Sequence, residues 1–175
     1  SGDNTFKIPD AVFRGEEEEG SNDSEGIPHD DMSYEDLAEM SQKALYDEYW
    51  DDTRKYFRRE YPNTLTDLGH DYWWFAHAID TLIDGYERSG NTIYLDRAKA
   101  AVSGVQKRHG KTLVNDYYDD MEWMALALVR LFDHTKDESY LNLAKDLFAE
   151  IEGGWTDVAG GGISWSKKKT QFKNT

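Results

Sequence analysis

The sequence predicts an all-α protein built from helical hairpins. Apolar residues recur at spacings of three and four over five stretches of the chain, which is typical of amphipathic helices. The polar connections between paired stretches are short, so helices that follow one another should be antiparallel neighbours. A repeated sequence pattern also links two of the hairpins. The five predicted helices cover residues 34–49, 70–88, 93–109, 120–135 and 138–151.

The first helix is predicted by an apolar face that ends near Tyr49. Leu37, Met40, Ala44 and Leu45 belong to this face together with Tyr49. The stretch from Trp50 to Asn63 breaks the helical period. Within it, Tyr61-Pro62-Asn63 predicts a loop.

The four later helices form two copies of one unit. Residues Trp74, Ala76, Ala78 and Leu82 recur 49 positions later as Trp123, Ala125, Ala127 and Leu131. Residues Tyr94, Leu95, Ala98 and Lys99 recur 46 positions later as Tyr140, Leu141, Ala144 and Lys145. Two matched strings predict a repeat architecture, either an open solenoid or a closed α/α toroid. The small alanines allow close helix approach, which favours the toroid.

The two ends of the chain differ in composition from the helical region. Residues 1–33 include the run Glu16-Glu17-Glu18-Glu19 and a polar, glycine-containing stretch, so we expect an acidic disordered or linker segment. The folded region should cover residues 34–175. After residue 151 the chain becomes rich in glycine around Trp155 and Trp165. This segment predicts either a flexible loop or a hairpin beside a ligand groove, with a short strand at 163–165.

Composition excludes several classes of function. The net charge of −15 disfavours nucleic acid and anionic membranes as partners, because phosphate groups would be repelled. The chain has no cysteine, so disulfides, thiolate zinc sites and cysteine nucleophiles are impossible. No run of residues is long and apolar enough for a membrane span. The histidines have no metal-site grouping, so we expect no metal; they are His29, His70, His77, His109 and His134.

The strongest candidate site is the polar and aromatic stretch from Asn115 to Trp123. It contains the consecutive acids Asp119 and Asp120 at the predicted start of a helix. One interpretation is structural, because Asp119 with Glu122 three residues later fits a capping box. The other is catalytic. A glycosidase needs one carboxylic acid to protonate the leaving oxygen and one carboxylate to attack or stabilise the anomeric carbon.

Adjacent aspartates can meet the geometric demand of that chemistry. Retaining glycosidases hold their two carboxyl groups about 5–5.5 Å apart. Successive Cα atoms are about 3.8 Å apart, so neighbouring side chains can reach this separation. Two close carboxylates resist ionising together, which raises one pKa and leaves that group able to act as the acid. The aromatic neighbours would supply walls of low dielectric constant.

These residues resemble a known family. Tyr117-Tyr118-Asp119-Asp120-Met121-Glu122-Trp123 followed by Ala125-Leu126-Ala127 is similar to the signature of glycoside hydrolase family 76, the endo-α-1,6-mannanases and their fungal cell-wall relatives. The segment Tyr72-Trp73-Trp74-Phe75-Ala76 resembles the family's preceding helix. Gly160-Gly161-Gly162-Ile163-Ser164-Trp165 and the final Lys173-Asn174-Thr175 resemble its glycine-rich hairpin and the start of its next helix.

The resemblance implies an (α/α)6 barrel and endo-acting, retaining hydrolysis of the α-1,6-mannan backbone in a bacterial enzyme that needs no cofactor. By motif position, Asp119 would be the nucleophile and Asp120 the general acid/base. Candidate sugar contacts are Trp73, Trp74, Tyr117, Tyr118, Trp123, Gly161, Gly162 and Trp165. Trp74 and Trp123 hold equivalent repeat positions, so core packing is the alternative for them.

The family pattern also defines what this chain lacks. Six hairpins are expected and about half are present, so we expect the fragment alone to be inactive unless the other half, or a pairing partner, completes it. An export or lipoprotein signal removed upstream would place the protein outside the cell, in the periplasm or at the cell surface. Three other functions stay open: transglycosylation on wall mannan, an unsaturated glucuronyl hydrolase, and a non-catalytic glycan-binding repeat protein.

Overall fold

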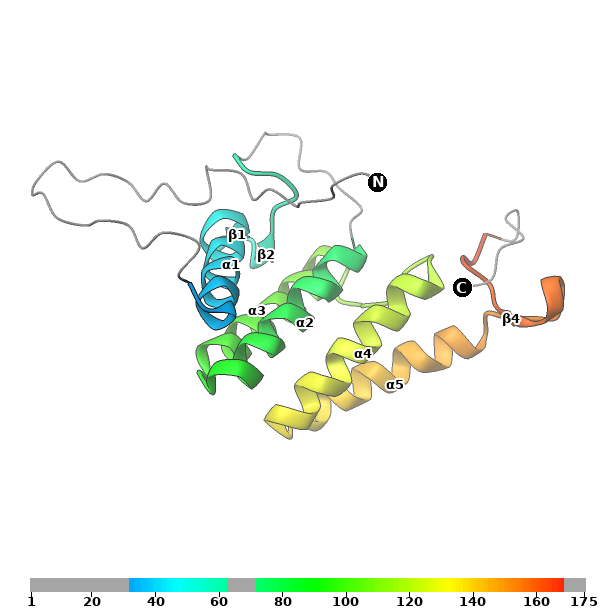
Figure 1. The fold of residues 1–175 in the computed structure, drawn as a ribbon. Coiled ribbons are helices and arrows are strands. Elements are labelled where there is room, and N and C mark those ends of the chain that lie inside the picture. Colours follow the sequence, from blue (N-terminus) through cyan, green and yellow to red (C-terminus); the bar gives the residue numbers. More distant parts are fainter. Residues whose placement is uncertain (1–31, 63–71, 169–175) are drawn as a thin grey trace, which may run out of the picture.

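The computed structural model describes residues 32–62 and 72–168, and it confirms the all-α prediction (Figure 1). Each predicted helix is present with similar bounds. The helices are α1 (Tyr34–Tyr49), α2 (Tyr72–Ser89), α3 (Ile93–Arg108), α4 (Tyr118–Thr135) and α5 (Glu138–Glu152). Helix α4 begins two residues before the predicted position, and the predicted start of α2 at residue 70 lies outside the described residues.

The two repeat units form two antiparallel hairpins that lie side by side. Helix α2 packs against α3 within its own hairpin and against α4 of the next, while α4 also packs against α5. Figure 1 shows α1 at one edge of this array and the β4 segment at the other. Buried alanines allow the close approach, because Ala76 of the first unit and Ala127 of the second are each 1% exposed. The repeated pair Leu82 and Leu131 is also buried in the core.

The N-terminal end of α1 is fixed by a capping box. The Ser33 hydroxyl accepts the Asp36 N–H at 3.1 Å, and the Asp36 carboxylate accepts the Ser33 N–H at 3.1 Å. The folded region therefore includes Ser33, one residue before the predicted boundary. Residues 1–31 of the predicted acidic segment (1–33) and the predicted loop residue Asn63 lie outside the described residues.

The stretch that breaks the helical period forms a small antiparallel pair. Strand β1 (Trp50–Asp51) pairs with β2 (Tyr56–Phe57). The Asp51 carboxylate accepts the N–H groups of Thr53 and Arg54, each at 3.0 Å, and so holds the turn between the strands. Strands of two residues have no measurable period, so the sequence predicted only the break and not this pairing.

The glycine-rich segment after α5 is a hairpin, as one of the two sequence interpretations expected. Strand β3 (Trp155–Thr156) pairs antiparallel with β4 (Gly162–Ile163), and the 3-10 turn η3 (Val158–Gly160) connects them. Strand β4 begins one residue before the predicted strand at 163–165 and does not include Trp165. Beyond the pair, the Ser164 N–H still donates to the Gly154 carbonyl at 2.9 Å.

Charged residues join the two hairpins across the facing surfaces of α2 and α4. The Arg130 guanidinium of α4 pairs with Asp80 and lies 2.7 Å from Asp84 and 2.9 Å from Glu87. His134, one turn later, contacts Glu87 at 2.7 Å. These α2–α4 contacts connect one repeat unit to the next. Within the described part of the chain, no helix is long and apolar enough to cross a bilayer.

Candidate active site

The consecutive acids Asp119 and Asp120 occupy the first turn of α4. The N-cap is Tyr117, which has an extended backbone and makes no side-chain capping bond. Asp119 is therefore the second residue of the helix and not its cap, so the capping-box interpretation of Asp119 with Glu122 is wrong. Asp119 Oδ1 does accept the N–H of Asp120 at 3.0 Å, which satisfies one donor of the first turn.

Asp120 has the environment of a carboxyl group that retains its proton. Its residue is 8% exposed, and its Oδ2 accepts the Nδ2–H of Asn115 at 2.8 Å. Burial raises the pKa of Asp120 to about 6, the neighbouring charge of Asp119 adds to the rise, and the Asn115 hydrogen bond opposes it. Asp120 thus has the raised pKa that was expected for one member of the pair.

Asp119 is partly exposed and has a different hydrogen-bond partner. Its Oδ2 accepts the indole N–H of Trp165 at 2.9 Å. Trp165 lies 46 residues further along the chain, directly after the glycine-rich hairpin. Trp165 was predicted as a sugar contact, and its bond to Asp119 was not predicted because no local spacing links the two residues.

The segment after the hairpin binds the loop before α4 through its backbone. Tyr118 N–H donates to the Trp165 carbonyl at 3.0 Å, and Lys167 N–H donates to the Asp116 carbonyl at 2.8 Å. An isolated bridge pairs Tyr117 with Ser166. These contacts fix where α4 begins and therefore where its first-turn carboxylates point.

Side chains at this junction leave little free space. The rings of Tyr117 and Trp165 lie 5.0 Å apart between centroids. A Cβ added to Gly154 would stand 2.7 Å from the ring of Tyr118, so only glycine permits this approach. Tyr118 is 7% exposed and belongs to the hydrophobic core. Tyr118 therefore packs in the core, and the prediction that it contacts a sugar is wrong.

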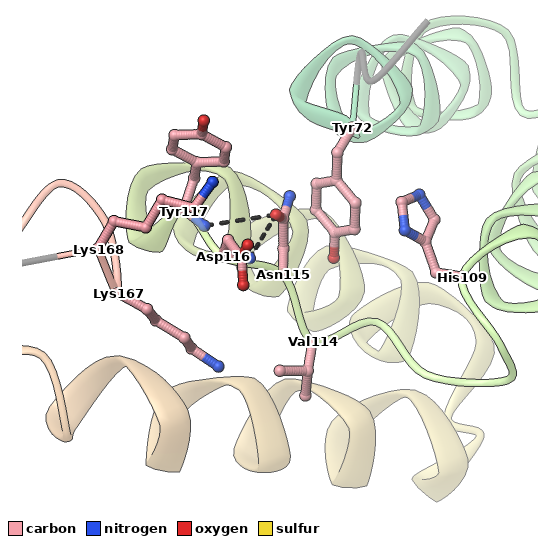
Figure 2. Close-up of a pocket in the computed structure, with 8 residues that line it drawn as sticks. All are labelled: Tyr72, His109, Val114, Asn115, Asp116, Tyr117, Lys167 and Lys168. Carbon is pink, nitrogen blue, oxygen red and sulfur yellow. Dashed lines mark hydrogen bonds between the residues drawn. The ribbon is translucent and has the colours of Figure 1, made fainter. Parts of the chain in front are cut away.

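A pocket of about 450 Å³ lies beside the loop before α4 (Figure 2), and neither carboxylate of the acid pair is among its lining residues. It reaches the pair through Asn115, which lines the pocket and also binds Asp120. Tyr72, at the start of α2, forms part of the wall, and its hydroxyl donates to the Leu113 carbonyl at 2.6 Å. The lining residues are Tyr72, His109, Val114, Asn115, Asp116, Tyr117, Lys167 and Lys168.

Three predicted sugar contacts form an exposed aromatic surface on α2 and α4. Trp73, Trp74 and Trp123 are 44%, 39% and 47% exposed, so none of them is a core residue. His77 connects them, with its ring 5.7 Å from Trp73 and 4.8 Å from Trp123. Trp123 follows the acid pair by one helical turn. The alternative that the repeated tryptophans fill the core is therefore wrong.

The backbone conformation requires glycine at both positions predicted to contact a sugar, Gly161 and Gly162. Gly161 has φ 93° and Gly162 has φ 144°, values that other residues rarely adopt. Gly161 also lies under the Trp155 ring, since an added Cβ would be 3.5 Å from it. Contact of either glycine with a sugar stays a prediction.

A second pair of consecutive aspartates, Asp51 and Asp52, has a purely structural role that differs from the environment of Asp119 and Asp120. Asp51 is buried like Asp120, but its carboxylate accepts the turn N–H groups described above and lies 3.7 Å from Arg58. Asp52 pairs with Lys55 at 2.6 Å on the surface. By contrast, the partners of Asp120 described above are a neutral amide and a second carboxylate. Among the described residues there is also no cluster of acids or histidines that could hold a metal ion.

Residues 32–175 match Glycosyl hydrolase family 76. The chain belongs to this family.

Two relatives show how far the similarity extends. The structure of the α-1,6-mannanase from Salegentibacter sp. HEL1_6 is 37% identical with a TM-score of 0.72, over 78% of this chain and 39% of that one. A putative mannan endo-1,6-α-mannosidase of Schizosaccharomyces pombe is 30% identical over 111 residues, which is 54% of this chain and 24% of the relative. The chain thus spans about two fifths of the solved mannanase and a quarter of the yeast protein.

The Salegentibacter enzyme is also known as inactive variants with bound sugar. In one variant two consecutive aspartates are changed to asparagine, and the protein is in complex with α-1,6-mannotriose. In another the same two are changed to alanine, with α-1,6-mannotetraose. These variants are 35% identical to this chain, with TM-scores of 0.69 and 0.70 over 78% of it and 39% of their own length.

Proposed function

We propose that the protein carrying this chain hydrolyses α-1,6-mannosidic linkages within mannan backbones, with retention of anomeric configuration. Asp119 is the nucleophile and Asp120 the general acid/base. The observation that carries this proposal is the unequal environment of two adjacent carboxyl groups. Asp120 is buried with a pKa raised to about 6, while Asp119 is partly exposed and holds a single indole donor on Oδ2.

Each role follows from the environment of the group. A carboxyl group with a raised pKa keeps its proton near neutral pH and can transfer it to the departing O6 as the glycosidic bond breaks. The Asp119 carboxylate attacks the anomeric carbon and forms a mannosyl ester. Asp120, now ionised, takes a proton from water, whose oxygen attacks the same carbon. The ester bond breaks, Asp119 is regenerated, and two inversions give net retention.

The relatives support this assignment at the level of the acid pair. The Salegentibacter variants combine loss of activity with replacement of two consecutive aspartates, and they bind α-1,6-mannooligosaccharides. Asp119 and Asp120 are a pair of this kind at the entrance of a helix. The exposed surface of Trp73, Trp74 and Trp123 would stack the flat faces of mannose rings along the chain.

Mannan digestion by the full-length protein tests the proposal. We expect Asp119→Asn and Asp120→Asn each to lower kcat/KM by a factor of about 10² to 10⁴, since a positioned proton donor or nucleophile contributes on this order. Asp52→Asn is the matched control, because it changes the second residue of the other aspartate–aspartate pair among the described residues and should leave the rate unchanged. Wild-type protein should release α-configured products of intermediate length, read by NMR and chromatography.

Azide separates the two roles. With Asp119→Ala, azide should replace the nucleophile and yield a β-mannosyl azide from an activated substrate. With Asp120→Ala, the mannosyl ester should still form, and azide attack on it should yield the α-mannosyl azide. Full hydrolysis by both single variants, or release of β-configured sugar by the wild-type protein, would refute the mechanism.

A further inference from the structure

The side-chain amide of Asn115 is held in one orientation by the backbone that follows it. Its Oδ1 accepts the N–H of Asp116 at 2.5 Å and the N–H of Tyr117 at 3.3 Å (Figure 2). The oxygen of an amide can only accept hydrogen bonds, and its NH₂ group can only donate them. Rotation of the amide by 180° would place its NH₂ against two N–H donors. The NH₂ group must therefore point away from the loop.

In that orientation the amide donates to one particular oxygen of Asp120. The distance from Asn115 Nδ2 to Asp120 Oδ2 is 2.8 Å, whereas Oδ1 of this carboxyl group does not take part in the bond. A protonated Oδ2 would accept the donated hydrogen more weakly than a carbonyl oxygen does. The carboxylic acid proton is therefore directed to Oδ1. Among the described residues, the charged and titratable groups that bear on Asp120 are Asp119 of α4 and Tyr72 of α2.

We propose that Asn115 is a positioning residue for the general acid, which selects the oxygen of Asp120 that carries the proton and limits how tightly the carboxyl group holds it. Without this donor, burial and the charge of Asp119 would act on Asp120 unopposed. The acid would then hold its proton to higher pH and transfer it less readily. The inference deepens the function proposed above and rests on Asp120 being the acid.

The first measurement does not depend on any hydrolytic activity. The pKa of Asp120 is followed by ¹³C NMR of labelled aspartate in the wild-type protein, Asn115→Leu and Asn115→Asp. Leucine keeps the volume but removes the donor. Aspartate keeps an acceptor for the two backbone N–H groups, so the loop is preserved, but it faces Asp120 with a carboxylate. Asn142→Leu, an exposed position on α5, is the matched control.

We expect the pKa of Asp120 to rise by about one pH unit in Asn115→Leu and further in Asn115→Asp, and to stay unchanged in Asn142→Leu. An unchanged pKa in Asn115→Asp, whose loop is intact by circular dichroism, would overturn the inference. That result would leave the proposed hydrolase untouched. A rise in pKa without mannan cleavage by the wild-type protein would instead uphold the contact and refute the hydrolase.

The second measurement is the pH profile of kcat/KM on mannooligosaccharides. Its basic limb reports loss of the proton from the acid of the free enzyme. With a raised pKa, the limb of Asn115→Leu moves to higher pH, so the ratio of variant to wild-type kcat/KM should increase between pH 6 and pH 8. A purely structural defect would lower the rate by the same factor at every pH, and such a constant ratio would also overturn the inference.

Discussion

The position of Asp120 illustrates the conflict between stability and chemistry at a single residue. A carboxyl group at 8% exposure loses most of its hydration, and the neighbouring Asp119 repels its charged form. One neutral amide donor compensates only in part. The folded state therefore holds Asp120 more easily when it is protonated, which suits a proton donor and penalises the fold once the proton leaves.

This conflict predicts a pH-dependent gain of stability in Asp120→Asn. The pKa of Asp120 rises from the ordinary 3.8 to about 6 on folding, so the folded protein binds more protons than the unfolded chain between these values. Its free energy of unfolding accordingly falls as pH increases through this window, and the full penalty is present above it. Asparagine carries no charge and still offers an oxygen to Asn115.

We expect Asp120→Asn to raise the free energy of unfolding by about 1–3 kcal/mol at pH 8, and by much less at pH 4. Urea denaturation at the two pH values measures this difference. Asp52→Asn, at the exposed member of the Asp51-Asp52 pair, serves as the comparison and should show no such gain at pH 8. An equal effect of Asp120→Asn at both pH values would contradict the assigned cause.

At the scale of elements, the helices could be predicted from the sequence, but the contacts that the loop and the hairpin make with the acid pair could not. Periodicity and repeats are local signals, and they located all five helices and the acid pair at the start of α4. The Trp165–Asp119 bond joins residues 46 positions apart, and the amide of Asn115 is oriented by backbone that only the folded loop provides. The first contact depends on tertiary structure, and the second on the conformation of an irregular loop. Neither leaves a periodic pattern in the sequence.

A glycine in α3 marks another contact that the sequence did not predict, between this helix and the turn that joins β1 to β2. Gly104 is buried in α3, where a Cβ would lie 1.6 Å from the carbonyl oxygen of Lys55, in the turn between β1 and β2. Glycine within a helix normally costs about 1 kcal/mol relative to alanine. Here alanine must displace backbone, so the usual sign is reversed.

We expect Gly104→Ala to lower the free energy of unfolding by about 1–3 kcal/mol, as overpacking of a core does. Ser103→Ala, at the exposed preceding position of the same helix, should be neutral or slightly stabilising. Thermal unfolding of both variants decides the matter. A stabilised Gly104→Ala would show that α3 does not approach the β1–β2 turn this closely.

At the scale of the whole molecule, the two repeat units are connected by charge as well as by apolar packing. Arg130 of α4 reaches three acids spread along α2, and His134 shares the last of them. The Arg130 side chain is 29% exposed, so its ion pairs are less screened than surface pairs. One arginine thus fixes the relative position of the two helices that carry the aromatic surface and the acid pair.

Replacing this arginine should weaken the connection by a modest amount. We expect Arg130→Met to lower the free energy of unfolding by about 1 kcal/mol, because partly exposed ion pairs contribute little individually but more as a network. The loss should shrink at 1 M salt, where screening is strong. Lys43→Met, which removes an exposed ion pair within α1, is the control and should have almost no effect.

The bond between the indole of Trp165 and Asp119 also has a consequence for synthesis on the ribosome. The chain is made from its N-terminus, so both aspartates emerge well before the tryptophan that binds one of them. A nascent chain that ends within α5 carries the acid pair, yet it has neither the indole donor nor the carbonyl that accepts the Tyr118 N–H. Until the hairpin has left the exit tunnel, Asp119 therefore lacks its indole donor and the start of α4 lacks this backbone contact.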